Sequence, residues 1–344
     1  MTSKPSSLMH EEAVSAADCV ALQLAHDADR YAALGRHLRA ASPRNAVTVA
    51  RGSSDHASGY LAYLIMARLG QLVTSLPMSL VTLYKSPLLT EGTLAISISQ
   101  SGQSPDLIEP IRYFRDGGAC TIALVNEIDS PLAQAAEWAL PLRAGPERSV
   151  AATKSFIASL AAGARLVAEW QDDAELKTAL AALPDALRQA ARSDWTAAIE
   201  ALAPARNIMV IGRGIGFPVA QEAALKFKET SALQAEAFSG AEIKHGPMAL
   251  IDDGYPLLIF ATRGPAQAGL VALATEMRGR GARVLLAAPP DVPERDLDLP
   301  LAGHPDLDPI VAIQAFYVMA AGLAAARGLD PDRPRHLSKV TKTS

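Results

Sequence analysis

The sequence is poor in cysteine and has no long stretch of one charge, and each shortage excludes a class of protein. Two cysteines occur among 344 residues, Cys19 and Cys120, and they are far apart in the chain. This argues against a disulfide framework or a thiolate metal site and favours a reducing compartment. The net charge is −4 and no basic tract occurs, so we expect no nucleic-acid partner. Spacings such as His-x-x-x-His are also missing, so no metal is expected.

Long uncharged runs are missing from the stretches where a leader or a membrane span would show most clearly. The first 16 residues carry Glu11 and Glu12 and no apolar run of signal-peptide length. The apolar stretch 151–170 is interrupted by Lys154 and Arg165, short of the roughly 18 to 20 unbroken apolar residues that a span needs. We therefore expect a cytoplasmic protein that does not contact a membrane.

What the sequence does contain is a repeated alternation of predicted strands and helices. Hydrophobic residues make up 49% of the chain, and its length predicts two domains at about 150 residues each. Apolar runs predict strands that alternate with helical patterns, first at 46–50 (strand), 55–69 (helix), 93–99 (strand), 105–115 (helix), 120–125 (strand), 138–142 (strand) and 150–170 (helix). The series restarts about 160 residues later with strands at 208–211, 257–261 and 283–287 and helices at 217–232 and 309–326.

A constant offset over several elements indicates an internal duplication of domain size. Because parallel strands need long, usually helical crossovers, the alternation predicts an α/β protein with two tandem doubly wound parallel-sheet sandwiches, helices covering both faces of each sheet. The predicted organisation is a helical preface (1–45), a first domain (46–172), a helical connector (173–204), a second domain (205–329) and an irregular tail (330–344).

Hydroxyl groups are concentrated where two predicted strands of the first domain end. Arg51-Gly52-Ser53-Ser54 follows the first strand, and Ser99-Gln100-Ser101-Gly102-Gln103-Ser104 follows the second. Ligands collect at the carboxyl ends of strands in doubly wound sheets, and the helix N-terminus after each turn favours an anion. Helix capping is the commoner meaning of one such turn. Two turns in one domain make a phosphate site as plausible as capping.

Nucleotide-binding motifs are missing, which narrows the identity of the anion. The segment that begins Gly212-Arg213-Gly214 has Phe217 where the dinucleotide fingerprint has its third glycine, and no Gly-Lys-Ser/Thr loop occurs. The phosphate is therefore expected on a small substrate, and no cofactor is expected.

Charged residues lie on one face of the helix predicted at 217–232. Glu222, Lys226 and Glu229 are spaced four and three residues apart and share that face. A surface ion pair is the usual meaning of this spacing. The apolar neighbours leave little of the helix polar, which keeps open the second interpretation, a general base that faces a cleft.

Two further residues are candidates for acid–base or amine chemistry. His245 lies in Glu242-Ile243-Lys244-His245-Gly246-Pro247, where a loop before a Gly-Pro break could hold a proton donor over a pocket. Lys339 lies in the predicted tail, where a solvated basic residue is the alternative.

Taken together, these segments resemble the sugar isomerase (SIS) family over residues 46–339. The matching strings are Ser99-Gln100-Ser101-Gly102, Val150-Ala151-Ala152-Thr153-Lys154-Ser155-Phe156, Glu222-Ala223-Ala224-Leu225-Lys226-Phe227-Lys228-Glu229, Glu242-Ile243-Lys244-His245-Gly246-Pro247 and Pro334-Arg335-His336-Leu337-Ser338-Lys339. The resemblance is strongest to the isomerase half of the glucosamine-6-phosphate synthases.

The resemblance implies a role for each candidate. The implied substrate-binding residues are Gly52, Ser53, Ser54, Ser99, Gln100, Ser101 and Ser104 at the phosphate of a hexosamine 6-phosphate, together with Val150, Ala152 and Glu222. Glu229 would move the proton between C1 and C2, and His245 would assist ring opening. Lys226 would support the site electrostatically, and Lys339 would supply a Schiff-base amine.

Two departures from the synthase pattern matter, because Ala152 replaces a serine and Arg51 replaces a cysteine. About 45 residues precede the first predicted strand, too few for a glutaminase domain. The resemblance therefore implies a SIS-type glucosamine-6-phosphate deaminase that releases ammonia and forms fructose 6-phosphate. The alternatives are a galactosamine-6-phosphate deaminase/isomerase, a fructosamine-6-phosphate deglycase and a sugar-phosphate sensor without turnover. The family also implies a homodimer.

Overall fold

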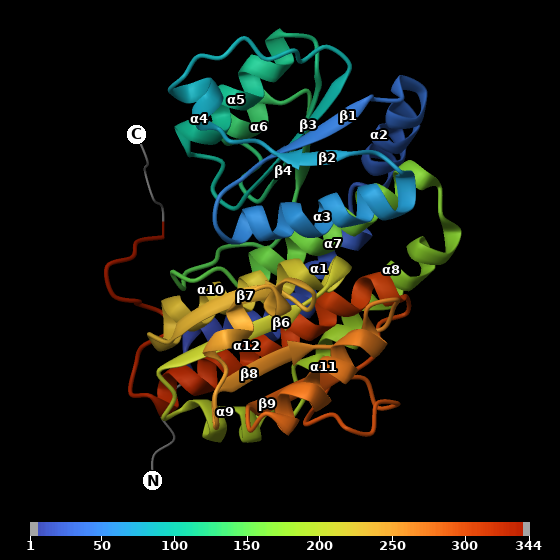
Figure 1. Cartoon of the computed structure of the whole chain (residues 1–344). Helices are drawn as coiled ribbons and strands as arrows, with labels where there is room; N and C mark the ends of the chain where they lie inside the picture. The colour runs from blue at the N-terminus through green and yellow to red at the C-terminus, as the bar shows by residue number, and fades with distance from the viewer. Residues whose placement is uncertain (1–5, 340–344) are drawn as a thin grey trace. The chain divides into compact units, whose positions relative to one another are not determined.

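The computed structural model describes residues 6–339, so the ends of the expected preface and tail, 1–5 and 340–344, lie outside the described residues. The chain divides into two compact units, each built on one five-stranded parallel sheet (Figure 1). The first-sheet unit comprises Asp18–Pro146 and Ser155–Ala181. The second-sheet unit comprises the described residues up to Ala17, Glu147–Lys154 and Ala182–Lys339.

The first sheet has the strand order β2-β1-β3-β4-β5. Its strands are β1 (Asn45–Val49), β2 (Val73–Ser75), β3 (Thr93–Ser99), β4 (Cys120–Val125) and β5 (Trp138–Pro141). The helices of this unit are α2 (Ala28–Ala41), α3 (Ser53–Leu69), α4 (Ser79–Thr82), α5 (Pro105–Asp116), α6 (Pro131–Ala135) and most of α7 (Lys154–Gln171). Helices α1 (Leu8–Ala25) and α8 (Ala174–Ala190) each continue from one unit into the other.

Helices cover both faces of the first sheet. All seven residues of β3 are buried, as expected for a central strand of a parallel sheet. On one face, Val49 and Val125 share a core with Leu107 and Ile111 of α5. Helices α3 and α7 lie on the other side (Figure 1) and pack closely, because a Cβ added at Gly163 of α7 would lie 3.5 Å from the Leu61 side chain of α3.

The second sheet has the strand order β10-β9-β8-β6-β7. Its strands are β6 (Asn207–Gly212), β7 (Gln234–Ser239), β8 (Pro256–Phe260), β9 (Arg283–Ala288) and β10 (Leu297–Asp298). Its other helices are α9 (Thr196–Leu202), α10 (Phe217–Ser231), α11 (Gln267–Gly279) and α12 (Asp308–Ala326). Leu270 and Leu273 of α11 pack on one face of the sheet, while Phe227 of α10 meets Phe316 of α12 edge-on, with ring centroids 5.0 Å apart.

Both sheets have the same order when their strands are numbered from the first, namely 2-1-3-4-5. The predicted α/β class, two tandem parallel-sheet sandwiches with helices around them, is confirmed. The shared order is what a duplication would leave behind, and the duplication itself stays a prediction, as do the predicted domain boundaries. Three short strands were not predicted, β2, β7 and β10, and each lies at an edge of its sheet.

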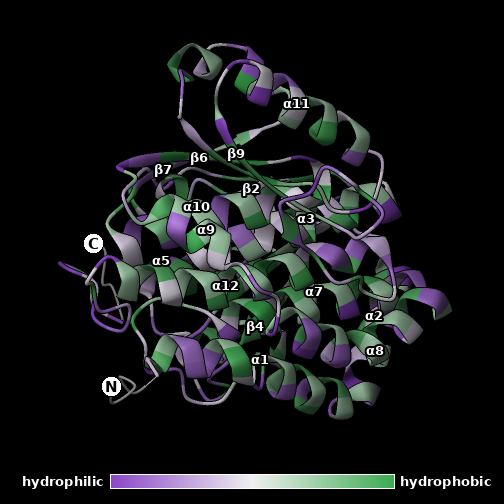
Figure 2. Ribbon diagram, turned by 90° about the horizontal axis from the view of Figure 1, so that it is seen from below, coloured by the Kyte–Doolittle hydropathy of each residue, from purple (hydrophilic) through white to green (hydrophobic). Residues whose placement is uncertain are grey.

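Two apolar stretches differ from expectation. The helix predicted from residue 150 begins at Lys154, so Val150 and Ala152 lie in an irregular segment before it. Within the described residues, the one helix long and apolar enough to cross a membrane by length and composition is at Pro305–Ala326, a stretch the sequence reading passed over. It is predominantly hydrophobic (Figure 2), and 78% of its most apolar window is buried within the protein, as in the core helix of a folded domain.

Candidate active site

The predicted phosphate-binding residues lie at the switch point of the first sheet. Strands β1 and β3 are neighbours, with Val49 opposite Ser97, and the strand order reverses between them. Gly52 precedes α3 with φ 56°, a backbone conformation that favours glycine. Ser53 and Ser54 form the first turn of α3 and are partly exposed. Ligands of doubly wound sheets bind at such a point.

The loop after β3 uses one of its serines for its own structure. Ser99 is 6% exposed, and its Oγ accepts a hydrogen bond from the Gly102 N–H at 3.0 Å. Gly102 has φ 62°, and a Cβ there would lie 2.1 Å from Ser130 Oγ, so the loop requires glycine. Ser104 stands at the N-cap of α5 but makes no side-chain capping bond. Its hydroxyl, with partly exposed Gln100 and Ser101, is therefore placed to contact a ligand.

The charged residues of α10 form a buried cluster, which excludes the surface-pair interpretation. The Glu222 and Lys226 side chains are 0% and 1% exposed, and Lys226 Nζ lies 3.5 Å from Glu222 Oε1. Lys226 also donates a hydrogen bond to Glu229 Oε2. Burial alone would lower the pKa of Lys226, but Glu222 and Glu229 outweigh it and hold that pKa above its ordinary value. Lys226 is thus a fixed cation beside Glu229, whose side chain is 19% exposed.

A tyrosine that the sequence reading did not predict completes this cluster. Tyr317 of α12 is fully buried and donates a hydrogen bond to Glu222 Oε1 at 2.9 Å. Burial, with the negative charge of Glu222, raises the pKa of Tyr317 well above its ordinary value, so the hydroxyl remains a donor. It supports the carboxylate that faces Lys226.

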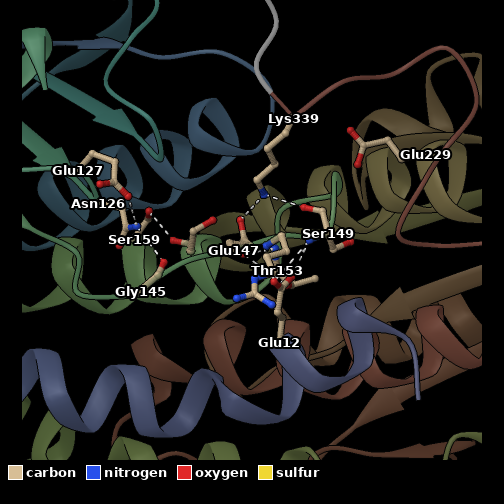
Figure 3. Close-up of polar contacts among 12 residues, drawn as sticks. Glu12, Asn126, Glu127, Gly145, Glu147, Ser149, Thr153, Ser159, Glu229 and Lys339 are labelled. Atoms are coloured by element: carbon tan, nitrogen blue, oxygen red, sulfur yellow. Dashed lines mark hydrogen bonds and ion pairs between the residues drawn. The ribbon is translucent and has the colours of Figure 1, made fainter. Parts of the chain in front are cut away.

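Lys339 is not a solvated end residue but reaches into the second-sheet unit (Figure 3). Its Nζ donates hydrogen bonds to Glu147 Oε2 and to the Ser149 carbonyl oxygen, both at 2.8 Å. The Glu147 side chain is fully buried, and it accepts a hydrogen bond from the Thr153 N–H at 3.0 Å. A buried carboxylate needs such partners, and here the Lys339 ammonium is one of them.

Glu229 lines a cavity on the side of α10 that the C-terminal segment covers. The cavity has a volume of about 570 Å³ and is bounded by α10 residues such as Leu225 and by segment residues such as Arg333 and Leu337. In Figure 3 the Glu229 carboxylate lies on the side of α10 toward Lys339. A predicted base and a predicted amine thus belong to one unit and are both accessible to a small molecule.

The remaining predicted residues are placed as follows. His245 is exposed after the short 3-10 turn Glu242–Lys244, and its N–H donates to the Glu242 carbonyl oxygen at 2.9 Å. Within residues 6–339 no hydrogen bond or ion pair joins its ring to Glu229 or Lys339. Val150 and Ala152 are partly exposed in the segment that also carries Glu147. The serines of the first sheet belong to the other unit.

Two acidic residues at this site escaped the sequence reading, Glu147 and Glu12. Each is a single carboxylate in a short segment with no helical or metal-binding spacing, and its partners are distant in the chain. A Glu before the Val150–Ala152 string was the signal available for Glu147. No group of three or more His, Cys, Asp or Glu side chains that could hold a metal ion occurs in the described part of the chain.

Comparison with known proteins identifies the family of this arrangement. The SIS domain model matches residues 40–168 and 201–287. The glutamine–fructose-6-phosphate aminotransferase (isomerizing) of Zymomonas mobilis is 34% identical over 310 residues, which cover 85% of this chain and 51% of that protein. The Aeropyrum pernix protein of the same name is 37% identical over 311 residues, covering 85% and 50%. The chain thus spans about half the length of the curated relatives it matches.

Solved structures give the same family. A Silicibacter pomeroyi DSS-3 protein described as a phosphosugar isomerase is 39% identical with a TM-score of 0.90, covering 95% of this chain and all of that one. The C-terminal domain of glucosamine-fructose-6-phosphate aminotransferase from Francisella tularensis has the same fold, with a TM-score of 0.81 at 24% identity over 97% of this chain and all of that one. The chain belongs to the SIS domain family and is related to the isomerising part of the glutamine–fructose-6-phosphate aminotransferases.

Proposed function

We propose that this protein is an amino-sugar-phosphate deaminase that converts glucosamine 6-phosphate and water to fructose 6-phosphate and ammonia. The observation that carries the proposal is the cluster on α10, in which the buried Lys226 ammonium holds the accessible Glu229 carboxylate. A sensor that only binds sugar phosphate has no need of a base held in this way. The proposal also requires that the serine turns of the first sheet and Glu229 engage one substrate molecule.

The phosphate anchors the substrate at the first sheet. Partly exposed hydroxyls of Ser53, Ser54 and Ser101 donate to the phosphate oxygens, and the N-termini of α3 and α5 favour its charge. The pyranose then opens to expose an aldehyde at C1. His245 transfers the proton of the C1 hydroxyl to the ring oxygen, which suits an imidazole near neutral pH.

Proton transfer between the carbons follows at Glu229. The C2 proton, acidified by the C1 carbonyl, passes to the Glu229 carboxylate, while the C1 oxygen gains a proton and the enaminol forms. Glu229 returns its proton to C1, which leaves an imine at C2. Lys226 stays protonated throughout and stabilises the negative charge that develops, because it is buried beside the reacting group.

The last step breaks the C2–N bond. Water adds to the C2 imine and ammonia leaves, which gives the ketone of fructose 6-phosphate. Lys339 donates a hydrogen bond to the C2 substituent as an ammonium, and it becomes a Schiff-base nucleophile only after it gives a proton to Glu147, its partner at 2.8 Å. The relatives named as isomerizing aminotransferases join these same carbons and nitrogen, and the proposed reaction runs that bond change in reverse with water as the acceptor.

Ammonia release is the direct test. Glucosamine 6-phosphate is assayed beside galactosamine 6-phosphate and a fructosamine 6-phosphate adduct, with fructose 6-phosphate measured by a coupled assay. We expect turnover to be fastest with glucosamine 6-phosphate. Faster turnover of either other substrate would transfer the function to the corresponding alternative, and tight binding without turnover of any of them would identify a sensor.

Glu229→Gln separates chemistry from binding. The amide keeps the shape and loses the base, so kcat should fall by about 10²- to 10⁴-fold with the substrate dissociation constant nearly unchanged. Glu236→Gln, at an exposed carboxylate on β7, is the matched control and should retain full activity. Full turnover by Glu229→Gln would contradict the assignment of the base.

The proposed homodimer gives His245 a function consistent with its exposed position. In a dimer, the loop of one protomer could complete the site of its partner. We expect inactive His245→Asn and inactive Glu229→Gln proteins, unfolded and refolded together, to recover about a quarter of wild-type activity if shared sites form at random. Light scattering that shows a fully active monomer would exclude this arrangement.

A further inference from the structure

The first turn of α1 binds the C-terminal segment that carries Lys339. Asp332 accepts hydrogen bonds from the Leu8 N–H at 2.8 Å and the Met9 N–H at 2.7 Å, through its two carboxylate oxygens. These are N–H groups at the start of an 18-residue helix, where no intrahelical partner exists. Asp332 therefore caps α1 from more than 300 residues away in sequence, and its negative charge suits that end of the helix.

One turn further on, α1 binds the segment that carries Glu147. Glu12 is 7% exposed, and its carboxylate accepts hydrogen bonds from the N–H groups of Arg148 and Ser149. The two segments also meet directly, because the Val150 N–H donates to the Asp332 carbonyl oxygen at 3.3 Å. Figure 3 shows Glu12 of α1 on one side of the 147–153 segment and Lys339 on the other.

The ion pair between Lys339 and Glu147 thus joins two segments that the same helix turn holds. Asp332 fixes the chain seven residues before Lys339, and Glu12 fixes the backbone directly after Glu147. All of these residues belong to the second-sheet unit. The arrangement determines where the Lys339 ammonium lies, because its other acceptor is the carbonyl oxygen of Ser149, in the segment that Glu12 binds.

We propose that the first turn of α1 is a clasp, formed by Glu12 and Asp332, that positions the Lys339 ammonium for the reaction. The inference rests on the proposed function in so far as Lys339 contacts substrate. Glu12 and Asp332 are positioning residues, since they act through the backbone on either side of the ion pair. They do not touch the substrate themselves.

The chemistry of Glu12 supports a positioning role over a simple packing role. Burial raises the pKa of the Glu12 carboxyl, and the N–H groups of Arg148 and Ser149 offset that effect only in part. A carboxylate is therefore kept where burial disfavours it. Glutamine at this position would turn an N–H₂ donor or a single oxygen toward two backbone donors, and it would release one of them.

Amine labelling tests the clasp without the use of a substrate. The purified full-length protein is treated with trace acetic anhydride, and acetylation of Lys339 is followed by mass spectrometry, with exposed Lys228 as the internal reference. The Lys339 side chain is 24% exposed and bound to two acceptors, so it should label slowly in the wild type. Glu12→Gln and Asp332→Asn should each raise its labelling rate about tenfold, the effect of losing a hydrogen bond to a charged group.

Glu11→Gln is the matched control, because Glu11 is exposed on the same helix turn. It should label as the wild type does. In the deaminase assay, Glu12→Gln and Asp332→Asn should lower kcat about tenfold with KM changed less than about threefold, as expected for a misplaced group that acts in the reaction.

The outcomes separate the clasp from the proposed function. Wild-type labelling of Lys339 in folded Glu12→Gln and Asp332→Asn proteins would overturn the clasp even if the wild type is a deaminase. Raised labelling in both, with no ammonia released by the wild type, would support the clasp and refute the deaminase. If Glu12→Gln does not fold, Glu12→Asp replaces it: raised labelling supports the clasp, and unchanged labelling overturns it.

Discussion

The two sheets share one strand order but use the same position in different ways. At the switch point of the first sheet, between β1 and β3, the loops present serine hydroxyls and glycine backbone. At the corresponding point of the second sheet, between β6 and β8, the loops present Arg213, Thr262 and Arg263. Topology alone therefore does not identify a binding site, and the loop residues decide which edge can bind an anion.

The arginine at the second edge already has a partner. Arg263 donates hydrogen bonds to both carboxylate oxygens of Asp308 and to the Ala302 carbonyl oxygen, each at 2.7 Å. Asp308 begins α12 and is 4% exposed, and it raises the pKa of Arg263 through these bonds. The second edge is thus closed by its own ion pair, while the first edge keeps partly exposed hydroxyls.

Glycine substitutions should break the comparison with the largest effect. Gly102→Ala forces a left-handed conformation and places a Cβ 2.1 Å from Ser130 Oγ, whereas Gly214→Ala in the second sheet has φ 59° and open space around the Cβ. We expect Gly102→Ala to lower the free energy of unfolding by about 2 to 4 kcal/mol, and Gly214→Ala by about 1 to 2 kcal/mol. Urea denaturation measures both, and equal losses would mean that the Ser130 side chain simply moves aside.

Removal of each edge's arginine comes next in size. Arg263→Met leaves Asp308 buried without its cation, and we expect a loss of about 2 to 3 kcal/mol in the free energy of unfolding, with substrate affinity unchanged. Arg51 of the first edge is 59% exposed in its pair with Asp106, so Arg51→Met should cost less than about 1 kcal/mol. A larger loss from Arg51→Met than from Arg263→Met would reverse the comparison.

The sequence predicted what local patterns encode. The central strands are continuous apolar runs, so β3 and β4 were predicted with their observed ends. The edge strand β7 (Gln234–Ser239) has small and polar residues, which carry little strand propensity. It nevertheless begins 161 residues after β2, so the offset of the duplication was a usable signal.

The candidate site was predictable only where its residues share a helix face or a known string. Glu222, Lys226 and Glu229 are close in sequence, so helical spacing placed them together correctly. Tyr317 and Glu12 reach the site from helices about 95 and more than 130 residues away from their partners. No local pattern marks such contacts, because they arise from the packing of the whole unit.

A hydroxyl removed from each edge sharpens the comparison in binding. Ser101→Ala should weaken binding of glucosamine 6-phosphate by about 0.5 to 3 kcal/mol if the hydroxyl donates to the phosphate. Thr262→Ala, at a residue 8% exposed in the second edge, should leave binding unchanged. Calorimetry in the Glu229→Gln background measures binding without turnover. Equal weakening by the two variants would place the phosphate elsewhere.

The smallest effect concerns pH, because hydroxyls of the first edge do not titrate while carboxylates of the second-sheet unit do. The pKa of Glu12 is raised above its ordinary value of 4.5, chiefly by burial, so between that value and the higher folded one the folded protein binds more protons than the unfolded chain. Stability from this group therefore falls as the pH rises through that window. Glutamine does not titrate, so the melting temperature of Glu12→Gln should rise relative to that of the wild type from about pH 4 to pH 7, whereas Ser101→Ala should follow the wild type. A difference that shrinks as the pH rises would mean that the N–H groups of Arg148 and Ser149 stabilise the carboxylate more than burial opposes it.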